Sequence, residues 1–317
     1  AFDHYYFESE VGKTGERIVK EGLKKGIFEE SEGAVIFPGE KYGLHSRVFV
    51  NSRGLPTYEA KELGLAPTKY KDFSYDLSLI VTGNEIIGYF KVLLAALKET
   101  NPELAEKTRH LSHGMVRLPE GKMSSRTGNI VTAEQLIEEV KARVQSIMES
   151  SGSEIPKEER EEAAEHIAVG AIKYSLLRVS LGKDIAFDFD KSLSLEGESG
   201  PYLQYTYARC RSILRQAGKP SLKAVPVVLS LEEERILRLV YRFPEVVEKA
   251  AESFSPNMVA AFAVDLAQAY NLFYSKHRVL QAENKEARNF RLQLTEGTAQ
   301  ILQNSLRLLG IRTLEKM

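Results

Sequence analysis

One loop of the sequence combines the side chains best suited to hold a polyphosphate. Segment 121–129, Gly-Lys-Met-Ser-Ser-Arg-Thr-Gly-Asn, carries an ammonium, hydroxyl groups and a guanidinium between flanking glycines. Such a loop can wrap phosphates with side-chain donors and with its own backbone N–H groups. By closing on a triphosphate, it could stabilise the charge that develops on leaving pyrophosphate. The alternative is a polar surface loop with a chance cluster of small residues.

The elements around this loop read as the end of an α/β region. A strand is predicted over 110–118, and Thr132 and Gln135 form a capping box that opens a helix over 132–149. Upstream, strand-like and helical stretches alternate, as in a parallel α/β sheet. The upstream strands are predicted at 34–37, 47–50 and 77–81, and the helices at 57–63, which Gly64 ends, and at 85–98.

Downstream of the loop the sequence is nearly all helical. Ser230 and Glu233 form a second capping box, Ser255-Pro256 begins another helix, and Gly310 ends the last one. Leu306, Leu309 and Ile311 are expected to dock that last helix on a bundle. The predicted helices cover 157–181, 201–217, 230–254, 255–277 and 285–309. The fold class is therefore α/β plus all-α.

Composition places the chain among ordinary globular proteins. It has 317 residues, of which 43% are hydrophobic and 27% charged. No apolar run approaches the roughly 20 residues of a membrane-spanning helix, and the first residues do not resemble a signal peptide. The single cysteine, Cys210, excludes an internal disulfide and a cysteine-based zinc site. These features favour a cytoplasmic protein without a membrane partner.

Charge is distributed unevenly although the net charge is −1. Residues 201–317 contain 17 Lys and Arg against 11 Asp and Glu, and the remainder contains 26 against 33. A basic C-terminal part could face a polyanion. Scatter over solvated helix faces is the simpler explanation when charge alone is considered.

Several motifs resemble one family in the same order along the chain. Segment 122–126, Lys-Met-Ser-Ser-Arg, resembles the KMSKS signature of class I aminoacyl-tRNA synthetases, in the form typical of arginyl enzymes. Segment 200–209, Gly-Pro-Tyr-Leu-Gln-Tyr-Thr-Tyr-Ala-Arg, is similar to the family's APYLQYAHAR block. The resemblance also includes 114–121, 184–190 and 308–317. The chain is identified as a member of the arginyl-tRNA synthetase family. The cysteinyl enzyme is a weaker alternative, since zinc-ligand cysteines are absent.

The resemblance implies a fold and its domains. Residues 1–131 would be the C-terminal part of a Rossmann-type catalytic domain with its KMSKS-type loop, 132–199 a helical stem-contact region, and 200–317 a helical anticodon-binding bundle. The sequence contains no His-x-Gly-His signature, which the class carries near its N-terminus. An N-terminal half supplied by the parent protein or by another chain is therefore expected as a partner.

The resemblance also assigns residues to ATP. The expected cofactor set is ATP with Mg²⁺ as its counter-ion and no protein-bound zinc. The class signature has a second lysine where Ser125 stands, so part of the charge would come from elsewhere. The catalytic candidates are Lys122, Ser124, Ser125 and Arg126, and the ATP-binding candidates are His113, Gly114, Met115, Val116 and Lys122.

Arginine would need a carboxylate that pairs with its guanidinium, and an aromatic wall. Tyr58 and Glu62 resemble the family's Tyr-x-x-x-Asp element, and their spacing puts both side chains on one helix face. Glu62 is one methylene longer than the usual Asp. Segment 83–90 resembles a block that usually has Gln at Ile86 and His at Tyr89, so either Glu85 compensates or the pocket is altered. An exposed Glu62 and a packed Tyr58 form the alternative.

Aromatic and basic residues at the start of the helical bundle suggest contacts with unpaired RNA. Tyr202, Gln204, Tyr205 and Arg209 are the tRNA-binding candidates, although tyrosines at this spacing also suit a helix core. The expected activity is ATP-dependent attachment of arginine to its tRNA through arginyl-adenylate. The 317 residues alone are expected to be inactive, and a non-catalytic tRNA-binding module is the alternative.

Overall fold

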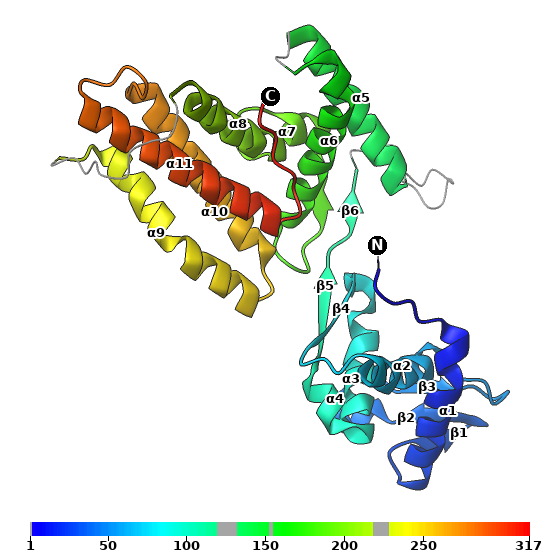
Figure 1. The fold of residues 1–317 in the computed structure, drawn as a ribbon. Coiled ribbons are helices and arrows are strands. Elements are labelled where there is room, and N and C mark those ends of the chain that lie inside the picture. Colours follow the sequence, from blue (N-terminus) through cyan, green and yellow to red (C-terminus); the bar gives the residue numbers. More distant parts are fainter. Residues whose placement is uncertain (1, 119–131, 152–154, 218–227) are drawn as a thin grey trace. The chain divides into compact units, whose positions relative to one another are not determined.

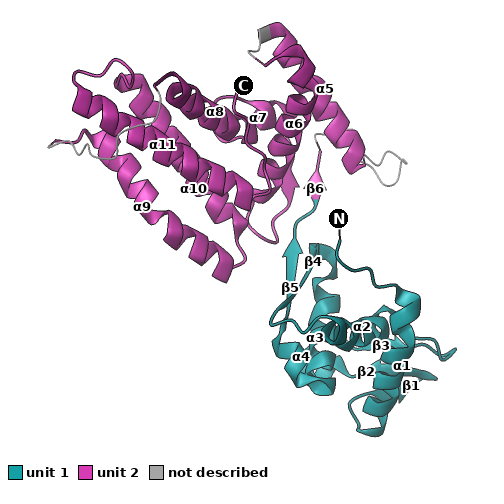
Figure 2. Cartoon of the chain, viewed as in Figure 1, with its two compact units in different colours: residues 1–115 teal, residues 116–317 magenta. Residues whose placement is uncertain are grey.

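The computed structural model describes residues 2–118, 132–151, 155–217 and 228–317. The chain divides into two compact units, residues 1–115 and 116–317 (Figure 2). Within the described ranges, no helix is both long and apolar enough to cross a membrane.

Unit 1 combines four helices with two small sheets (Figure 1). The helices are α1 (Glu8–Lys24), α2 (Tyr58–Asp72), α3 (Ile87–Thr100) and α4 (Pro102–Glu106). The antiparallel sheet contains β1 (Glu29–Ser31), β2 (Ala34–Phe37) and β3 (Arg47–Val50). The parallel pair contains β4 (Ser78–Gly83) and β5 (Thr108–His113), and a 3-10 turn over Asn84–Ile86 precedes α3.

The β4–α3–β5 part is the parallel α/β unit that the sequence predicted. Its covered face includes His110, whose ring stacks on Phe90 of α3 with 4.0 Å between centroids. His110 Nε2 also lies 2.7 Å from Thr82 Oγ1, and burial lowers the pKa of the imidazole. On the opposite face Leu79 and Val81 are exposed, Val81 at 62%. One face of this two-stranded sheet is therefore bare among the described residues.

The prediction of a parallel sheet was wrong for 34–37 and 47–50. These segments form β2 and β3, which pair antiparallel. The connection between them holds only a short 3-10 turn, Gly39–Tyr42. A parallel crossover needs a dozen or more residues, usually a helix, so this link permits only a hairpin-like return.

The helix predicted over 57–63 does not end at Gly64. Helix α2 continues through Gly64 to Asp72. Gly64 lies where α2 crosses α1, so it serves close packing of the two helices and does not end α2. A Cβ on Gly64 would overlap the backbone carbonyl of Val11, and a Cβ on Gly15 would overlap that of Ala60. These glycines let the two helix backbones touch. The prediction that Gly64 ends the helix was therefore wrong.

Unit 2 is mostly helical (Figure 1). Its first part contains β6 (Val116–Arg117), α5 (Ala133–Ser151), the 3-10 turn Lys157–Glu159, α6 (Arg160–Leu177), β7 (Ile185–Ala186) and α7 (Phe189–Leu193). Its second part contains α8 (Gly200–Ala217), α9 (Leu231–Glu252), α10 (Pro256–Lys276) and α11 (Lys285–Leu308). The strand predicted over 110–118 is wrong as one element, since β5 ends at His113 and β6 pairs with β7 instead.

Local capping explains where several helices begin. The Thr132 hydroxyl accepts from Gln135 N at 3.2 Å, and the Gln135 side chain accepts from Thr132 N. Ser230 and Glu233 make the same reciprocal pair at the start of α9. Both predicted capping boxes are confirmed.

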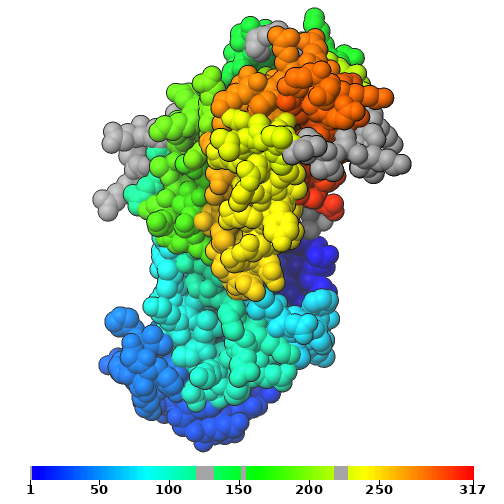
Figure 3. Space-filling view, turned by 90° about the vertical axis from the view of Figure 1, so that its left-hand side faces the viewer, coloured from blue at the N-terminus to red at the C-terminus, as the bar shows by residue number. Residues whose placement is uncertain are grey.

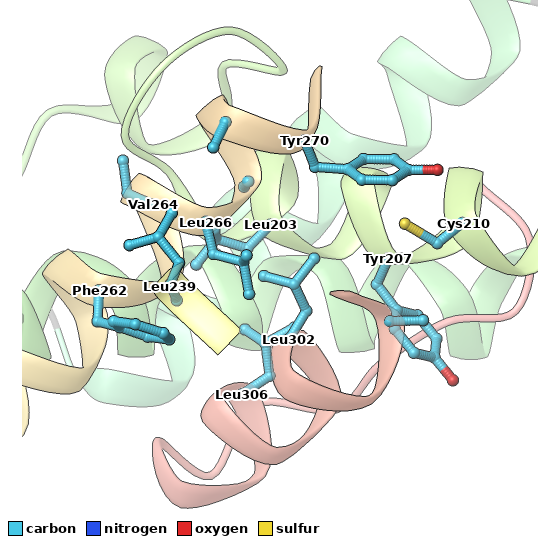
Figure 4. Close-up of a cluster of buried hydrophobic side chains, with 14 of the residues drawn as sticks. Leu203, Tyr207, Cys210, Leu239, Phe262, Val264, Leu266, Tyr270, Leu302 and Leu306 are labelled. Atoms are coloured by element: carbon cyan, nitrogen blue, oxygen red, sulfur yellow. The ribbon is translucent and has the colours of Figure 1, made fainter. Parts of the chain in front are cut away.

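The core of unit 2 lies between α8, α9, α10 and α11. Leu203, Leu266 and Leu302 are fully buried there together with Tyr270 and Cys210 (Figure 4). Burial raises the pKa of the Cys210 thiol to about 12, so it behaves as a small apolar group. As predicted, Leu306, Leu309 and Ile311 dock the last helix on this core. In the space-filling view α9, coloured yellow, runs along the surface (Figure 3).

Candidate functional site

A carboxylate without a partner lies on α2 of unit 1. Glu62 is half-buried, and within the described residues it makes no hydrogen bond or ion pair. Burial raises the pKa of its carboxyl group; Lys69 acts in the opposite direction and Glu8 adds to the increase. A desolvated carboxylate in this condition is a candidate for binding a cation from outside the protein.

A neighbouring carboxylate on the same helix shows what Glu62 lacks. Glu59 is only 8% exposed, and its Oε1 lies 3.0 Å from Nη1 of Arg47 on β3. The Arg47 guanidinium also lies 5.4 Å from the ring centroid of Tyr89 on α3. The carboxylate of Glu59 is therefore paired with the guanidinium of Arg47, which also contacts the Tyr89 ring. Glu62, three residues further along, carries the same carboxylate group but has no guanidinium paired with it among the described residues.

Tyr89 links the two carboxylates. Burial raises the pKa of its phenol far above the usual value, the negative charges of Glu62 and Glu59 raise it further, and Arg47 opposes them. Tyr89 thus stays neutral. Arg47 and Glu59 were not among the residues predicted from sequence. The only signal was the position of Glu59 inside the Tyr58–Glu62 motif, and its burial depends on how α2 packs against β3.

The other predicted arginine-binding residues lie apart from this arrangement. Tyr58, the first residue of α2, is 66% exposed, and Lys61 Nζ lies 5.1 Å from its ring centroid. Glu85 is exposed on the 3-10 turn after β4, where a Cβ on Gly83 would overlap its carboxylate. Within the described residues no hydrogen bond joins Tyr58, Glu62 and Glu85. Their shared role in arginine binding stays a prediction.

Four of the predicted ATP-binding residues, 113–116, follow one another from the end of β5 to the start of β6. His113 is exposed, with Nδ1 2.9 Å from the carbonyl oxygen of Gly114, which is buried. Met115 ends unit 1 and Val116 begins unit 2. The catalytic candidates Lys122, Ser124, Ser125 and Arg126 lie outside the described residues. No group of three or more His, Cys, Asp or Glu among the described residues is placed to hold a metal.

Two of the predicted tRNA-binding residues serve the interior of unit 2. Tyr202 is buried, and its hydroxyl accepts from Asn271 Nδ2 at 2.9 Å. Gln204 is fully buried, and its amide donates to the carbonyls of Arg312 at 2.7 Å and His166 at 3.2 Å. In this geometry both side chains tie helices together, and neither is open to RNA.

The other two, Tyr205 and Arg209, are half-buried and contact two residues of α10. The Arg209 guanidinium lies 4.8 Å from the ring centroid of Tyr205 and 5.2 Å from that of Tyr274. It donates to Asn271 Oδ1 at 2.6 Å and to the Tyr205 hydroxyl at 3.2 Å. Tyr274 is 42% exposed. We call Tyr205, Arg209, Asn271 and Tyr274 the arginine–tyrosine patch.

Sequence motifs could not reveal this patch as a whole. Asn271 and Tyr274 stand more than 60 residues after Arg209, on a helix with no motif of its own. Asn271 also donates to Thr206 Oγ1 at 3.0 Å, so its position is fixed from α8. The result is a guanidinium held rigidly between two tyrosine rings, one of them open to solvent.

Comparisons with known proteins show the family of the chain. The family model described as "tRNA synthetases class I (R), catalytic domain" matches residues 7–189, and the "DALR anticodon binding domain" matches residues 203–317. A class I synthetase catalytic domain followed by an anticodon-binding helical domain is the class that these matches define. The chain belongs to the arginyl-tRNA synthetase family. The domain limits predicted at 131 and 199 stay predictions.

Individual relatives support the same family. The arginine–tRNA ligase of Parabacteroides distasonis is 36% identical over 324 residues, covering 100% of this chain and 54% of the relative. That of Treponema denticola is 38% identical over 326 residues, covering 100% and 55%. The chain therefore spans about half the length of the curated relatives it matches.

Solved structures give the same fold. The arginyl-tRNA synthetase of Thermus thermophilus aligns with a TM-score of 0.81 and 27% identity, covering 95% of this chain and 58% of that one. The Mycobacterium tuberculosis methionyl-tRNA synthetase aligns with a TM-score of 0.55 at 15% identity, covering 94% and 59%. The second likeness extends to the fold alone.

Proposed function

We propose that this chain is part of an arginine–tRNA ligase. The carboxylate of arginine would attack the α-phosphate of ATP, pyrophosphate would leave, and the arginyl group of the adenylate would pass to the terminal ribose of the arginine tRNA. The observation that carries the substrate assignment is Glu62, a desolvated carboxylate on the same helix as Glu59 that makes no hydrogen bond or ion pair among the described residues. A guanidinium is the cation whose planar donors best match a carboxylate.

ATP is proposed as the co-substrate, with Mg²⁺ carried on its phosphates. Support comes from the sequence of the loop that contains Lys122, Ser124, Ser125 and Arg126, whose donors suit a polyphosphate. His113, Gly114 and Met115 are proposed to contact the nucleotide. The single cysteine and a tRNA substrate favour the cytoplasm.

The substrate proposal is tested through Glu62. The protein, expressed as its gene encodes it, is assayed for arginine-dependent pyrophosphate exchange. E62Q keeps the shape of the side chain but removes the charge, so we expect KM for arginine to rise about 100-fold, since pairs with charged partners contribute roughly 1.5–3 kcal/mol. E62D restores the charge and should restore most of the affinity. An unchanged KM in E62Q would refute the assignment.

The bare face of β4 supports the proposed partner. Parallel sheets are normally covered on both faces, and a two-stranded sheet is rarely stable alone. We propose that further strands and helices of the nucleotide-binding fold pack against Leu77, Leu79 and Val81. Because the 317 residues contain only one of the two class signatures, this polypeptide alone should not catalyse the exchange reaction. Exchange by the 317 residues alone would refute that expectation.

The arginine–tyrosine patch is the proposed tRNA contact. Tyrosine rings can stack on unpaired bases and Arg209 can contact a phosphate. R209Q should weaken tRNA binding about 10-fold, and R235Q, which changes an exposed arginine of α9 without an ion pair, should not. The alternative function, a non-catalytic tRNA-binding module, predicts tRNA binding without arginine activation by the protein as its gene encodes it.

A further inference from the structure

The C-terminal segment 310–317 places a carboxylate between two arginines of α8. Arg211 Nε lies 3.1 Å from both Oε1 and Oε2 of Glu315, and Arg215 Nη1 lies 3.2 Å from Oε2. The Tyr207 hydroxyl donates to Oε1 at 2.9 Å. Burial would raise the pKa of the Glu315 carboxyl, but the hydrogen bonds from Arg211 and Tyr207 outweigh it and hold that pKa below its usual value.

The segment has anchors that do not involve Glu315. Ile311 is buried in the core of unit 2, and Leu314 packs against the apolar cluster between α5 and α6. The carbonyl of Arg312 accepts from the buried amide of Gln204 at 2.7 Å. Glu315 is therefore not needed to hold the segment in place.

The Glu315 carboxylate and the two arginines are open to solvent, whereas Tyr207 is buried. Glu315 is 55% exposed, and the arginines are 39% and 40% exposed. Exposed ion pairs contribute little to stability and exchange readily with other ions. Glu296 is the other carboxylate that acts on Arg211, and Lys316 beside Glu315 makes no ion pair within the described residues. Without Glu315 the site would carry an excess of positive charge.

Two guanidinium groups one helical turn apart, with a phenol beside them, suit an anion with several oxygens. A phosphodiester group of RNA offers such oxygens, and Arg pairs with phosphate in the same forked geometry as with carboxylate. The site lies on α8, the helix that also carries Tyr205 and Arg209.

We propose that Tyr207, Arg211 and Arg215 form a phosphate site for RNA that Glu315 occupies when RNA is absent. The carboxylate acts as an internal competitor: it keeps the arginines in place and leaves when a backbone phosphate enters. This proposal rests on the proposed tRNA-binding function and adds a second contact to it.

The test measures binding of an arginine tRNA transcript to the full chain and its variants. Fluorescence anisotropy reports the affinity of each protein at several salt concentrations. E315Q frees the site, so we expect about two- to five-fold tighter binding, the size of one exposed charge interaction. The dependence of affinity on salt should become steeper by about one ion for each arginine released. The double variant R211Q/R215Q should bind more weakly, and E315Q should have no further effect in that background.

Two controls separate this effect from other causes. E252Q removes an exposed carboxylate at the end of α9, so it measures the gain from net charge alone. E315D keeps the charge and should bind like the wild type, which separates competition from loosening of the segment. E315Q binding no tighter than E252Q, or still tighter in the R211Q/R215Q background, would overturn the proposal while leaving tRNA binding intact. No binding of tRNA by any variant or by the wild type would overturn the proposed function as well.

Discussion

At the scale of single residues, two glutamates on one helix have different surroundings. Glu59 forms an ion pair with Arg47, whereas Glu62 is desolvated and forms no ion pair among the described residues. The folded protein tolerates the free carboxylate although it costs stability, which is typical of groups kept for binding. The negative charges of both glutamates help to keep Tyr89 neutral.

This cost gives Glu62 a defined effect on stability. Its pKa in the folded chain is raised above the ordinary value of 4.5, so below pH 4.5 it is protonated in both states and has no effect. As pH rises from 4.5 through the raised pKa, the unfolded chain ionises first and wild-type stability falls relative to E62Q. Urea unfolding of both proteins between pH 5 and 8 measures the difference. A gap that stays constant across this range would contradict the described burial of Glu62.

Sequence motifs supplied the candidate site residues, but they could not show which of these side chains the packing buries. Tyr58 and Glu62 were chosen from their resemblance to the family's Tyr-x-x-x-Asp element, and their role stays a prediction. Gln204 was also chosen by motif, yet it is fully buried, because alternation of tyrosines and polar residues does not show which side of α8 faces the bundle. Tyr274 was missed because its partner Arg209 is distant in sequence.

At the scale of elements, close backbone contact defines the α1–α2 pair. A Cβ on Gly15 would overlap the carbonyl of Ala60, so G15A must push the helices apart and should destabilise unit 1 by about 2 kcal/mol or more. Gly12 on the same helix is the matched control, because its Cβ would lie 3.5 Å from Pro56 Cγ, an ordinary contact. G12A should be neutral or stabilise by about 0.5–1 kcal/mol. Equal effects in thermal unfolding would contradict the close crossing.

A buried ion pair connects α11 to the start of α9. Arg291 Nε lies 3.0 Å from Glu233 Oε1, and the two side chains are 8% and 7% exposed. R291M leaves Glu233 buried without its partner and should cost about 3–5 kcal/mol. R238M removes an exposed pair with Glu234 and should cost only about 0.5 kcal/mol. Similar unfolding midpoints in urea for the two variants would show that the buried pair is not retained in solution.

Elements with local signals were predicted well. Capping boxes and proline positions located the starts of α5, α9 and α10, because these signals act within one helical turn. Gly64 was taken for a helix end because the sequence does not contain the neighbouring α1 backbone. The split of 110–118 into β5 and β6 depends on pairing with β7, about 70 residues further along.

At the scale of the whole molecule, the chain consists of one unit with α/β character and one helical unit. The acidic remainder and the basic residues 201–317 differ in net charge, from −7 to +6, counted over the sequence. A polyanionic partner on residues 201–317 agrees with that difference, and the arginine–tyrosine patch and the Glu315 site both lie in this part of the chain. The bare face of β4 marks where the proposed partner would complete unit 1.

The central claim is that this chain recognises the arginine tRNA. The most direct measurement is filter binding of the 317-residue chain to an arginine tRNA transcript and to a transcript of another tRNA, over a series of salt concentrations. We predict tighter binding to the arginine tRNA, with an affinity that falls as salt rises because arginine–phosphate contacts release ions. Equal affinity for both transcripts, or binding that salt does not weaken, would contradict the claim.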